Sequence, residues 1–465
     1  MITSDEMRML DFYAPCFGVT IDELMERAGK GLADIISKMI KKTEPVLVVC
    51  YHGNNGGDGL CAARHLAAKG YSVRVHFLGK PERMKPETRR QWKLLPKQIL
   101  VQDPVYRDYA LIVDALLGTG NKGILKGDLS KAVRSMIGKR LVAVDIPSAS
   151  VLKPGMTVSF HDRKSWVSGK SVVVDIGLPK QLKQMVTTMI PVKEERFAHK
   201  GSQGRVLVVG GSEHYSTAPF LAASAVAALR SGVDWVEVAA PEKVAWTINC
   251  ISPDLVTTKL KGEEITKDHV AAIHKIPHDV MLIGNGMGKN EAIPPLLGVS
   301  KRKVVDADAV KMADLREIRN ALLTPHRGEA KTLFAHSGIK TTVLDDLVTF
   351  EKRLLTGKTA LDAFAMLKKS VNRIQLKLGS NVLLIKGPID LIISKKQWKF
   401  NVTGVPRMAV AGTGDVLAGL CAGFAAQMSL FDAGCSAAFL IGKLGEKQKG
   451  KFVASDLVRA ISNFI

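Results

Sequence analysis

A run of small residues that ends in one acid lies near the end of the chain, in a pattern suited to phosphoryl transfer. The run reads Ala409-Val410-Ala411-Gly412-Thr413-Gly414-Asp415 and leads into a predicted helix, Asp415–Gln427. Backbone amides at a helix N-terminus stabilise phosphoryl oxygens, and an adjacent carboxylate can take the proton from an attacking hydroxyl. Because phosphoryl transfer needs both, we predict a phosphate site at Gly412–Gly414 and a base at Asp415, in preference to a plain helix cap.

Other candidate contacts in the same half are turns that follow predicted strands. They are Val208–Ser212, Ile283–Gly288, Leu323–Glu329 and the hairpin-like turn Lys386–Asp390. A lone histidine is usually a satisfied surface or core residue, but Pro325 and Gly328 fix the loop around His326, which favours a ligand contact. Lys386 either faces a nucleotide phosphate or points to solvent.

A second glycine-rich turn lies in the first half. It reads Gly53-Asn54-Asn55-Gly56-Gly57-Asp58-Gly59, between a predicted strand and the predicted helix Leu60–Lys69. Glycines let the backbone approach a ligand, and amides at a helix start suit phosphate. The turn lacks the GxGxxG fingerprint, so a conventional hydride-transfer site is not expected.

Polar residues also end two later strands of the first half. Asp114 precedes Gly118-Thr119-Gly120, and Asp145 precedes Ser148. Ligands of parallel sheets bind outside the carboxyl ends of the strands, so these residues should converge with Asn55 and Asp58. Their oxygens suit a hard cation, whereas the alternative for any single aspartate is a helix cap.

Short apolar runs that alternate with helical stretches predict two α/β sandwiches with mostly parallel sheets covered on both faces. The expected strands are Val46–Cys50, Ser72–Leu78, Leu111–Asp114, Leu141–Asp145, Ser171–Asp175, Arg205–Val209, Trp235–Ala239, Val280–Ile283, Lys303–Asp306, Val382–Ile385 and Leu391–Ser394. Ile21–Lys41 and Pro219–Arg230 are expected helices. A charged stretch followed by a loop-like one places the boundary near residue 195, which gives domains 1–195 and 196–465.

Composition is that of a globular protein, with 46% hydrophobic and 24% charged residues among 465. Neither a membrane span nor a signal peptide is expected, so the cytoplasm is the expected location. Lysines and arginines give a net charge of +22, but they are dispersed, which favours anionic small substrates over nucleic acid as the main partner. The six cysteines are expected to be reduced core residues.

The first-half motifs, together with Met25-Glu26-Arg27-Ala28-Gly29, resemble the epimerase domain of the NAD(P)H-hydrate repair enzymes. That domain interconverts the two C6 epimers of hydrated NADH and NADPH, called NADHX and NADPHX. The chain departs from the family pattern at Arg27, where Asn is usual, and at Ala149-Ser150-Val151, where Gly-Leu-Asp is usual. The resemblance implies a potassium ion held by Asn55, Asp114 and Ser148, and it makes Asp145 a catalytic residue beside the nicotinamide. The hydrate-binding residues that it implies are Asn54, Asn55, Gly56, Gly57, Asp58, Gly118, Thr119, Gly120 and Asp145.

From about residue 199 to residue 465 the chain resembles the ribokinase-like dehydratase domain of the same enzymes. The residues that carry this resemblance are His199-Lys200-Gly201, Gly210-Gly211-Ser212, Ala218-Pro219, Asp306-Ala307-Asp308-Ala309, Thr324-Pro325-His326 and Gly412-Thr413-Gly414-Asp415. The resemblance implies that the C6 hydroxyl of the S epimer is phosphorylated from ADP or ATP and leaves as phosphate, with Asp415 as base and Mg²⁺ bridging the nucleotide phosphates. The residues expected to line the hydrate site are Ala218, Gly286, Gly288, His326 and Asp415. Those expected to hold the nucleotide are Lys386, Gly387, Pro388, Ile389, Asp390, Gly412, Thr413 and Gly414.

Two alternatives stay open. A ribokinase-like small-molecule kinase would stop at a stable phosphate ester, and the N-terminal half, with its altered Ala149, would be a non-catalytic binding domain. A homo-oligomer is expected in either case.

Overall fold

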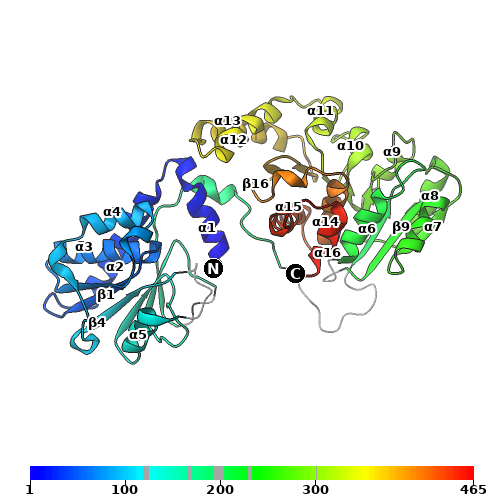
Figure 1. The fold of residues 1–465 in the computed structure, drawn as a ribbon. Coiled ribbons are helices and arrows are strands. Elements are labelled where there is room, and N and C mark those ends of the chain that lie inside the picture. Colours follow the sequence, from blue (N-terminus) through cyan, green and yellow to red (C-terminus); the bar gives the residue numbers. More distant parts are fainter. Residues whose placement is uncertain are drawn as a thin grey trace. The chain divides into compact units, whose positions relative to one another are not determined.

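The structure of the chain is a computed structural model that describes residues 1–118, 125–165, 167, 169–191, 204–228, 233–299 and 301–464. It divides into two compact units, drawn in Figure 1. Unit 1 comprises Met1–Lys183 with Gly357–Thr359, and unit 2 comprises Gln184–Thr356 with Ala360–Ile465. The expected boundary near residue 195, the His199-Lys200-Gly201 motif, Thr119 and Gly120 lie outside the described residues.

Unit 1 is built on a seven-stranded sheet of order β3-β2-β1-β4-β5-β6-β7. Every neighbouring pair of its strands is parallel. The strands are β1 (Val46–Cys50), β2 (Val73–Phe77), β3 (Leu100–Val101), β4 (Leu111–Ala115), β5 (Leu141–Val144), β6 (Met156–Phe160) and β7 (Ser171–Val174). The helices are α1 (Ser4–Tyr13), α2 (Ile21–Ser37), α3 (Asn54–Ala68), α4 (Pro86–Leu94) and α5 (Gly127–Met136).

Helices cover both faces of this sheet, as Figure 1 shows, because alternate residues of each buried strand point to opposite sides. On one face, a Cβ at Gly59 of α3 would lie 2.9 Å from the sulfur of Cys50, so α3 packs closely on β1. On the other face, Leu47 and Val49 pack with Met136 of α5 in one buried cluster. The unit is therefore a Rossmann-like three-layer sandwich, as predicted.

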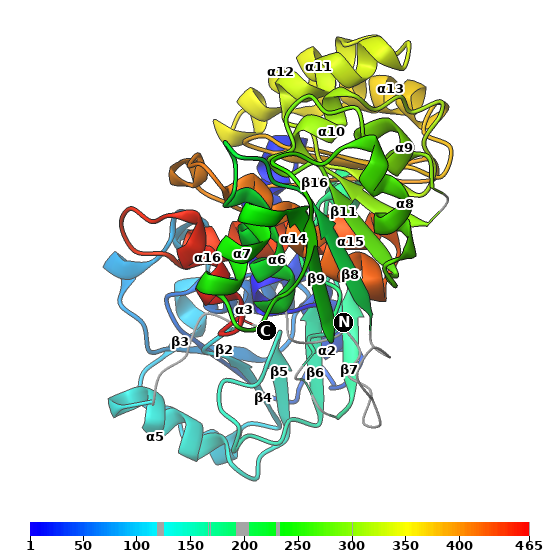
Figure 2. The same cartoon turned by 90° about the vertical axis from the view of Figure 1, so that its right-hand side faces the viewer.

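Unit 2 is built on a nine-stranded sheet of order β10-β9-β8-β11-β12-β13-β14-β15-β16. Figure 2 shows β9, β8 and β11 side by side. The strands are β8 (Arg205–Val209), β9 (Trp235–Pro241), β10 (Val256–Leu260), β11 (Val280–Ile283), β12 (Arg302–Val305), β13 (Ala321–Leu323), β14 (Val382–Ile385), β15 (Asp390–Ser394) and β16 (Trp398–Asn401). All pairs are parallel except β14–β15 and β15–β16, which are antiparallel.

The helices of unit 2 also lie on both faces of the sheet. They are α6 (Ala218–Ala228), α7 (Glu242–Ile251), α8 (Lys267–Lys275), α9 (Ile293–Leu297), α10 (Ala307–Lys311), α11 (Arg327–His336), α12 (Thr342–Leu355), α13 (Leu361–Gln375), α14 (Thr413–Gln427), α15 (Leu430–Lys447) and α16 (Ala454–Ile461). A Cβ at Gly434 of α15 would lie 3.4 Å from Ile392, whereas Phe400, whose register partner is Leu391, stacks against Phe350 of α12. Successive residues of a strand face opposite ways, so α15 and α12 cover opposite faces, and the predicted second α/β sandwich is confirmed.

The predicted strands are all present, with shifts of one or two residues at their ends. Three strands were not predicted in addition to the two-residue β3, namely β6, β10 and β16, and the strand expected to end at the Leu323–Glu329 turn is β13. Two helices begin earlier than expected: α3 at Asn54 instead of Leu60, and α14 at Thr413 instead of Asp415. In both cases the glycine-rich turn is itself the first turn of the helix.

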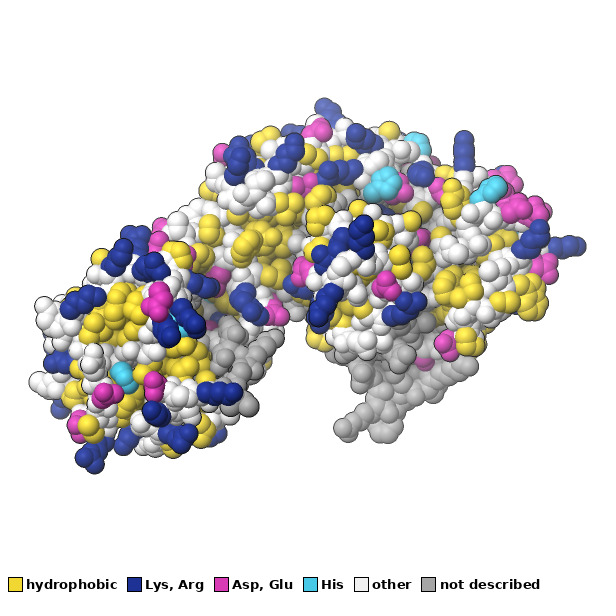
Figure 3. All heavy atoms as spheres, in the orientation of Figure 1, with side chains coloured by type: hydrophobic (Ala, Val, Ile, Leu, Met, Phe, Trp, Pro, Cys, Tyr) yellow, Lys and Arg dark blue, Asp and Glu magenta, His cyan; other side chains and the backbone are white. Residues whose placement is uncertain are grey.

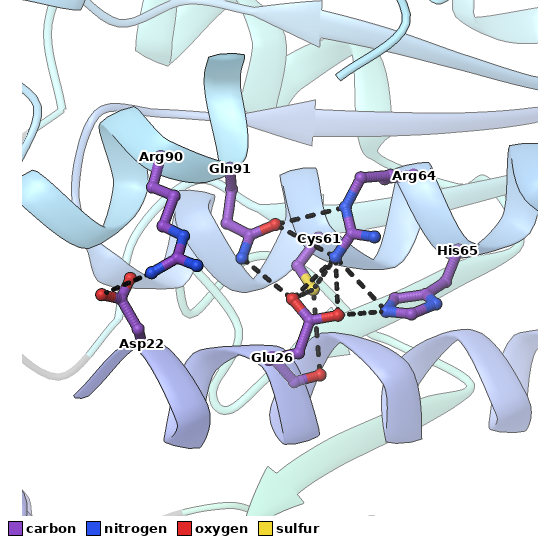
Figure 4. Close-up of polar contacts among 7 residues, drawn as sticks. All are labelled: Asp22, Glu26, Cys61, Arg64, His65, Arg90 and Gln91. Carbon is purple, nitrogen blue, oxygen red and sulfur yellow. Dashed lines mark hydrogen bonds and ion pairs between the residues drawn. The ribbon is translucent and has the colours of Figure 1, made fainter. Parts of the chain in front are cut away.

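A polar cluster around Glu26 ties α2 to α3 and α4 (Figure 4). Arg64 Nη2 donates to both carboxylate oxygens of Glu26 at 2.7 Å, His65 Nε2 lies 2.8 Å from Oε1, and Gln91 donates to Oε2 at 3.1 Å. Burial alone would raise the pKa of Glu26, but these hydrogen bonds lower it to about 2.

The same cluster places the ligand atoms of Glu26, Cys61 and His65 within 4.8 Å of one another, which is a spacing suited to a metal ion. Arg64 Nη2 also lies 3.5 Å from the sulfur of Cys61 and 3.4 Å from His65 Nε2. The guanidinium therefore already occupies the centre that a cation would take, and the cluster holds α2 and α3 together without one.

The cysteine prediction is confirmed in five positions and wrong in one. All six are free, and only Cys250 is exposed. The buried positions of α7 are Val244, Ala245 and Ile248, and the helical period places Cys250 on the opposite side.

The surface drawn in Figure 3 carries Lys and Arg side chains over both units, and they do not gather in one stripe there. None of the described helices has the length and apolar character of a membrane span.

Candidate active sites

Unit 1 contains a cavity of about 450 Å³ at the carboxyl ends of β1, β4 and β5. Of the predicted site residues, Asn54, Asn55, Asp58, Gly118 and Asp145 line it. Of the five residues predicted to converge from their strand-end positions, Asn55, Asp58 and Asp145 line this cavity, and Asp114 and Ser148 do not.

The glycine-rich turn forms the wall of this cavity as the first turn of α3. A Cβ at Gly56 would overlap the carbonyl oxygen of Tyr51, and a Cβ at Gly57 would lie 2.6 Å from Met25. These two glycines let the turn pack against β1 and α2. Gly53, at the N-cap, has open space around it.

Asp114 and Ser148 lie together beside the cavity. Ser148 donates to Asp114 from its hydroxyl at 2.5 Å and from its backbone at 2.8 Å, and its hydroxyl accepts the backbone N–H of Leu117 at 2.9 Å. Asp114 is fully buried, and burial raises its pKa against the lowering effect of these hydrogen bonds. No lysine or arginine pairs with it in the described part of the chain. Asn55 approaches from α3, close to Gly118, and its Nδ2 has no partner among the described residues.

Asp145 forms an ion pair that the sequence did not reveal. Lys164 is fully buried, and its Nζ lies 3.1 Å from Asp145 Oδ1 and donates to the carbonyl of Phe160 at 3.1 Å. Burial raises the pKa of Asp145, and Lys164 opposes that effect. Asp145 has a φ of 62°, a left-handed conformation that aspartate tolerates better than most residues and that marks a constrained position.

Two more acids face the same cavity, Asp11 from α1 and Asp58 from α3. Burial raises the pKa of Asp11 to about 6, with Lys164 lowering it and Asp145 raising it. Burial also raises the pKa of Asp58, which Asp145 and Asp11 raise further. Asp11, like Lys164, was not predicted as a site residue.

Both departures from the family pattern fit the local structure. The Arg27 guanidinium donates to the carbonyls of Ile176, at 3.3 Å, and Gly177, at 3.0 Å, and so holds a segment whose Ile176 lines the cavity. Ala149 does not have a positive φ, and it packs on the apolar cluster between the sheet and α5. A side chain at position 149 is therefore compatible with the backbone that carries Ser148.

Unit 2 brings five polar residues into one hydrogen-bonded chain at the carboxyl ends of its strands. Asp415 Oδ1 accepts Asn285 Nδ2 at 2.7 Å, and the same nitrogen donates to Asp306 Oδ2 at 3.1 Å. Lys386 Nζ donates to Asp306 Oδ1 at 2.9 Å, as does the Thr324 hydroxyl at 2.7 Å. Burial raises the pKa of Asp415 to about 6, although the hydrogen bond from Asn285 lowers it. Asn285 and Asp306 were not predicted as site residues.

The predicted phosphate site lies beside this chain. Gly412 is the N-cap of α14 with φ 89°, and no side chain caps that terminus. A Cβ at Gly414 would lie 3.5 Å from Lys386 Nζ, so the lysine sits next to the turn. Helix amides and an ammonium thus face the same place, as a phosphate requires.

The predicted hydrate-site residues are partly brought together. A Cβ at Gly286 would lie 3.3 Å from that of Ala218, and the Gly288 N–H donates to Asp308 at 2.9 Å. His326 pairs with Lys386 in a parallel bridge, but its Nδ1 caps α11 by accepting the N–H groups of Gly328 and Glu329. The other ring nitrogen, Nε2, lies 3.4 Å from Glu329 Oε1 and is the one that can also face a ligand.

The Lys386–Asp390 turn joins β14 to β15 as an antiparallel hairpin, as predicted. Ile389 is buried, and Asp390 accepts the N–H of Gly387 at 3.2 Å and the Asn401 amide at 3.1 Å. Gly387 and Pro388 form the exposed tip. Within this turn, Lys386 and the tip are the parts that can face a nucleotide.

Fold and sites together define an α/β enzyme with two separate centres, each containing a lysine paired with a strand-end aspartate. Residues 21–165 match the family model for the YjeF-related protein N-terminus, and residues 206–465 match that for NAD(P)H-hydrate dehydratase. The chain belongs to the family of bifunctional NAD(P)H-hydrate repair enzymes.

The relatives that it resembles span almost the whole chain. The bifunctional NAD(P)H-hydrate repair enzyme of Hyperthermus butylicus is 36% identical, over 99% of this chain and 91% of its own length. That of Methanothermobacter thermautotrophicus is 34% identical, over 98% and 93%. A solved structure of the ADP/ATP-dependent NAD(P)H-hydrate dehydratase from Bacillus subtilis, co-crystallised with ATP and Mg²⁺, is 21% identical with a TM-score of 0.47, over 59% of this chain and 92% of that one.

The glycine turn of unit 1 gives a direct test of the packing around the cavity. Gly56→Ala should lower the free energy of unfolding of unit 1 by about 2–4 kcal/mol, because the new methyl group overlaps a backbone oxygen that cannot move aside. Gly53→Ala is the matched control, since its Cβ meets nothing within 4 Å. Calorimetric unfolding of both variants measures the difference, and equal midpoints would contradict the described packing.

Proposed function

We propose that this chain repairs hydrated NADH and NADPH with both of its units. Unit 1 interconverts the R and S epimers at C6, and unit 2 dehydrates the S epimer with ADP or ATP. The observation that carries the proposal is the position of Asp415, an acid in the first turn of a helix whose N-terminus has no side-chain cap, beside Lys386. We expect the enzyme to act in the cytoplasm as a homo-oligomer.

In unit 2, Asp415 takes the proton of the C6 hydroxyl while the hydroxyl oxygen attacks the terminal phosphorus of the nucleotide. The bond from that phosphorus to the leaving nucleotide oxygen breaks, which releases AMP from ADP or ADP from ATP. The C6–O bond of the ester then breaks, phosphate leaves, and loss of a C5 proton restores the dihydronicotinamide ring. The amides of Gly412–Gly414 and the ammonium of Lys386 stabilise the charge on the transferring phosphoryl group.

The nucleotide would bring Mg²⁺ with it, and the ion would neutralise charge on the phosphates. Gly387 and Pro388 at the exposed hairpin tip, with Lys386 and Gly414, would hold the nucleotide. Ala218, Gly286, Gly288 and Nε2 of His326 would line the hydrate site.

Asp415→Asn tests the role of the base. The variant should fold and bind nucleotide, but dehydration of S-NADHX should fall by roughly 10²–10⁴-fold, the usual contribution of a general base. The assay follows NADH and phosphate release from an R/S NADHX mixture with ADP, Mg²⁺ and K⁺. Near-normal turnover would exclude Asp415 as the base, and a stable phosphate ester in place of NADH would favour the kinase alternative.

In unit 1, the cavity holds three carboxyl groups, those of Asp11, Asp58 and Asp145, around one buried ammonium, that of Lys164. Arg8 and Lys85 also line it, but they are exposed at its rim. Three partly buried acids so close to one ammonium disfavour full ionisation, so the cavity retains a proton that can be given to a ligand.

That proton suits epimerisation at C6. An acid gives its proton to the hydroxyl, the C6–O bond breaks, water leaves, and the ring nitrogen lone pair forms a C=N bond. Water then adds at C6 from the other face and returns a proton to a carboxylate. Asp145, held by Lys164, is the acceptor, and Asp11 is the acid, since its pKa near 6 suits proton transfer at neutral pH.

Asp11→Asn tests this assignment. Because the acid must be protonated, the wild-type rate should fall as the pH rises through about 6, and the variant should lose both that pH dependence and about 10²-fold of the rate. The exposed Asp128→Asn on α5 is the control. An R-to-S rate in Asp11→Asn that matches wild type at every pH would exclude the role.

The donor set of Asp114, Ser148 and Asn55 fits a potassium ion. It contains one buried carboxylate, paired with no lysine or arginine among the described residues, together with neutral side chains. A transition metal would prefer His or Cys ligands. Potassium bound there would balance the charge of Asp114 and fix the loop of Ser148 relative to Asp145.

Asp114→Ala should therefore impair epimerisation and leave dehydration by unit 2 intact. The measurement is R-to-S conversion with potassium and with potassium replaced by tetramethylammonium. Equal rates in both salts would exclude the ion, and no conversion in either would favour the non-catalytic alternative for unit 1.

A further inference from the structure

Asn285 lies at the centre of the polar chain of unit 2, in a turn that leaves its backbone no freedom. It follows β11 and is fully buried. A Cβ at Gly284, which has φ 119°, would overlap the carbonyl oxygen of Asp306, and one at Gly286 would lie 2.6 Å from that of Tyr215. The carbonyl of Asn285 also accepts the N–H of Gly211 at 2.9 Å. The amide side chain is therefore presented from a fixed point.

The two acceptors around this amide determine its orientation. The nitrogen lies 2.7 Å from Asp415 Oδ1 and 3.1 Å from Asp306 Oδ2. An ionised carboxylate can only accept hydrogen bonds, so the NH₂ end must face both. The buried Oδ1 is left without a partner among the described residues. The contact with Asp415 thus persists although the other end of the amide is unsatisfied, a costly arrangement for a buried group.

We propose that Asn285 is a positioning residue for the dehydratase reaction, whose amide fixes Asp415 Oδ1 and connects it to the Asp306–Lys386 ion pair. This rests on the proposed function of unit 2. Asp415 has no ammonium of its own, because Lys386 Nζ bonds the far oxygen of Asp306. Asp306 repels a charge on Asp415, and Lys386 attracts it. The Asn285 N–H groups are the direct donors to Asp415 that offset this repulsion.

The proposal predicts a change in the pH dependence of the reaction. The pKa of Asp415 is raised to about 6 by burial and lowered by the hydrogen bond from Asn285. Loss of that bond moves the pKa upward, so the base is protonated over a wider range of pH. Turnover therefore falls at neutral pH and returns at higher pH, where Asp415 ionises again.

The experiment measures kcat and KM for S-NADHX with ADP from pH 5 to pH 10, on the full chain. Asn285→Ala should shift the acid limb of kcat upward by about one pH unit, which is about a tenfold loss below pH 7, with recovery towards the wild-type plateau near pH 9. Asn285→Asp keeps the shape of the side chain but replaces the amide donor with a third acid beside Asp306 and Asp415. The upward shift of the acid limb should therefore be larger than in Asn285→Ala. If Asn285→Ala does not fold, Asn285→Asp carries the test.

Asn381→Ala is the matched control, a buried asparagine of the same unit that bonds Ala321 N–H and the carbonyl of Ile318 away from the chain around Asp415. It should lower thermal stability and leave the acid limb in place. An unshifted limb in the Asn285 variants, or a loss that is the same at every pH, would overturn the proposal.

A second measurement separates this proposal from the proposed function. ¹³C-carboxyl NMR of aspartate-labelled chain, with the Asp415 signal identified by its absence in Asp415→Asn, titrates Asp415 without turnover. An upward shift of that titration in Asn285→Asp supports the role of Asn285 even if no NADH is formed, and an unchanged titration rejects it.

Discussion

A lysine–aspartate pair with one buried member lies at the carboxyl edge of each sheet, and that member is Lys164 in unit 1 and Asp306 in unit 2. Lys164 pairs with Asp145 at 3.1 Å in unit 1, and Lys386 pairs with Asp306 at 2.9 Å in unit 2. Removing a charge from water costs several kcal/mol unless the charge is paired. In each site, one aspartate therefore takes up the nearby lysine ammonium as its partner. The remaining acids of each site must then be protonated or stabilised by neutral donors. The surrounding residues decide between protonation and stabilisation by neutral donors, and this choice sets the chemistry that each unit can perform.

The parts of the fold that could be predicted are those with a local signal. Apolar runs such as Val46–Cys50 predicted the buried strands correctly, because strands covered on both faces are apolar throughout. The missed strands lack such runs. In β6, Thr157 and Ser159 are buried although polar, and β10 carries two threonines and a lysine.

The residues of the two candidate sites also divide into those with a local sequence signal and those without one. Glycine-rich turns indicate that the backbone approaches a ligand or another segment closely, so the Gly53–Gly59 and Gly412–Asp415 segments could be predicted from sequence. Lys164 and Asp11 were missed because nothing near them in sequence marks them, and Lys164 lies 19 positions from Asp145. The turn that contains Asn285 was a candidate contact, but the contact of Asn285 with Asp415 spans 130 positions and was not predicted. The one signal available for Asn285 was its place between Gly284 and Gly286, since paired glycines indicate that the intervening residue is held against other backbone.

The two sites use surplus carboxylates in opposite ways. In unit 1, Asp11, Asp58 and Asp145 share Lys164. Burial raises the pKa of all three, and repulsion between the acids raises those of Asp11 and Asp58 further. In unit 2, neutral donors surround the acids: Thr324 and Asn285 donate to Asp306, and Asn285 also donates to Asp415. Burial raises the pKa of Asp415 to about 6, and the hydrogen bond from Asn285 opposes that rise. Asp11 and Asp415 therefore have similar pKa values, and the proposed acid and base differ in what surrounds each carboxyl group: other acids around Asp11, and an amide donor beside Asp415.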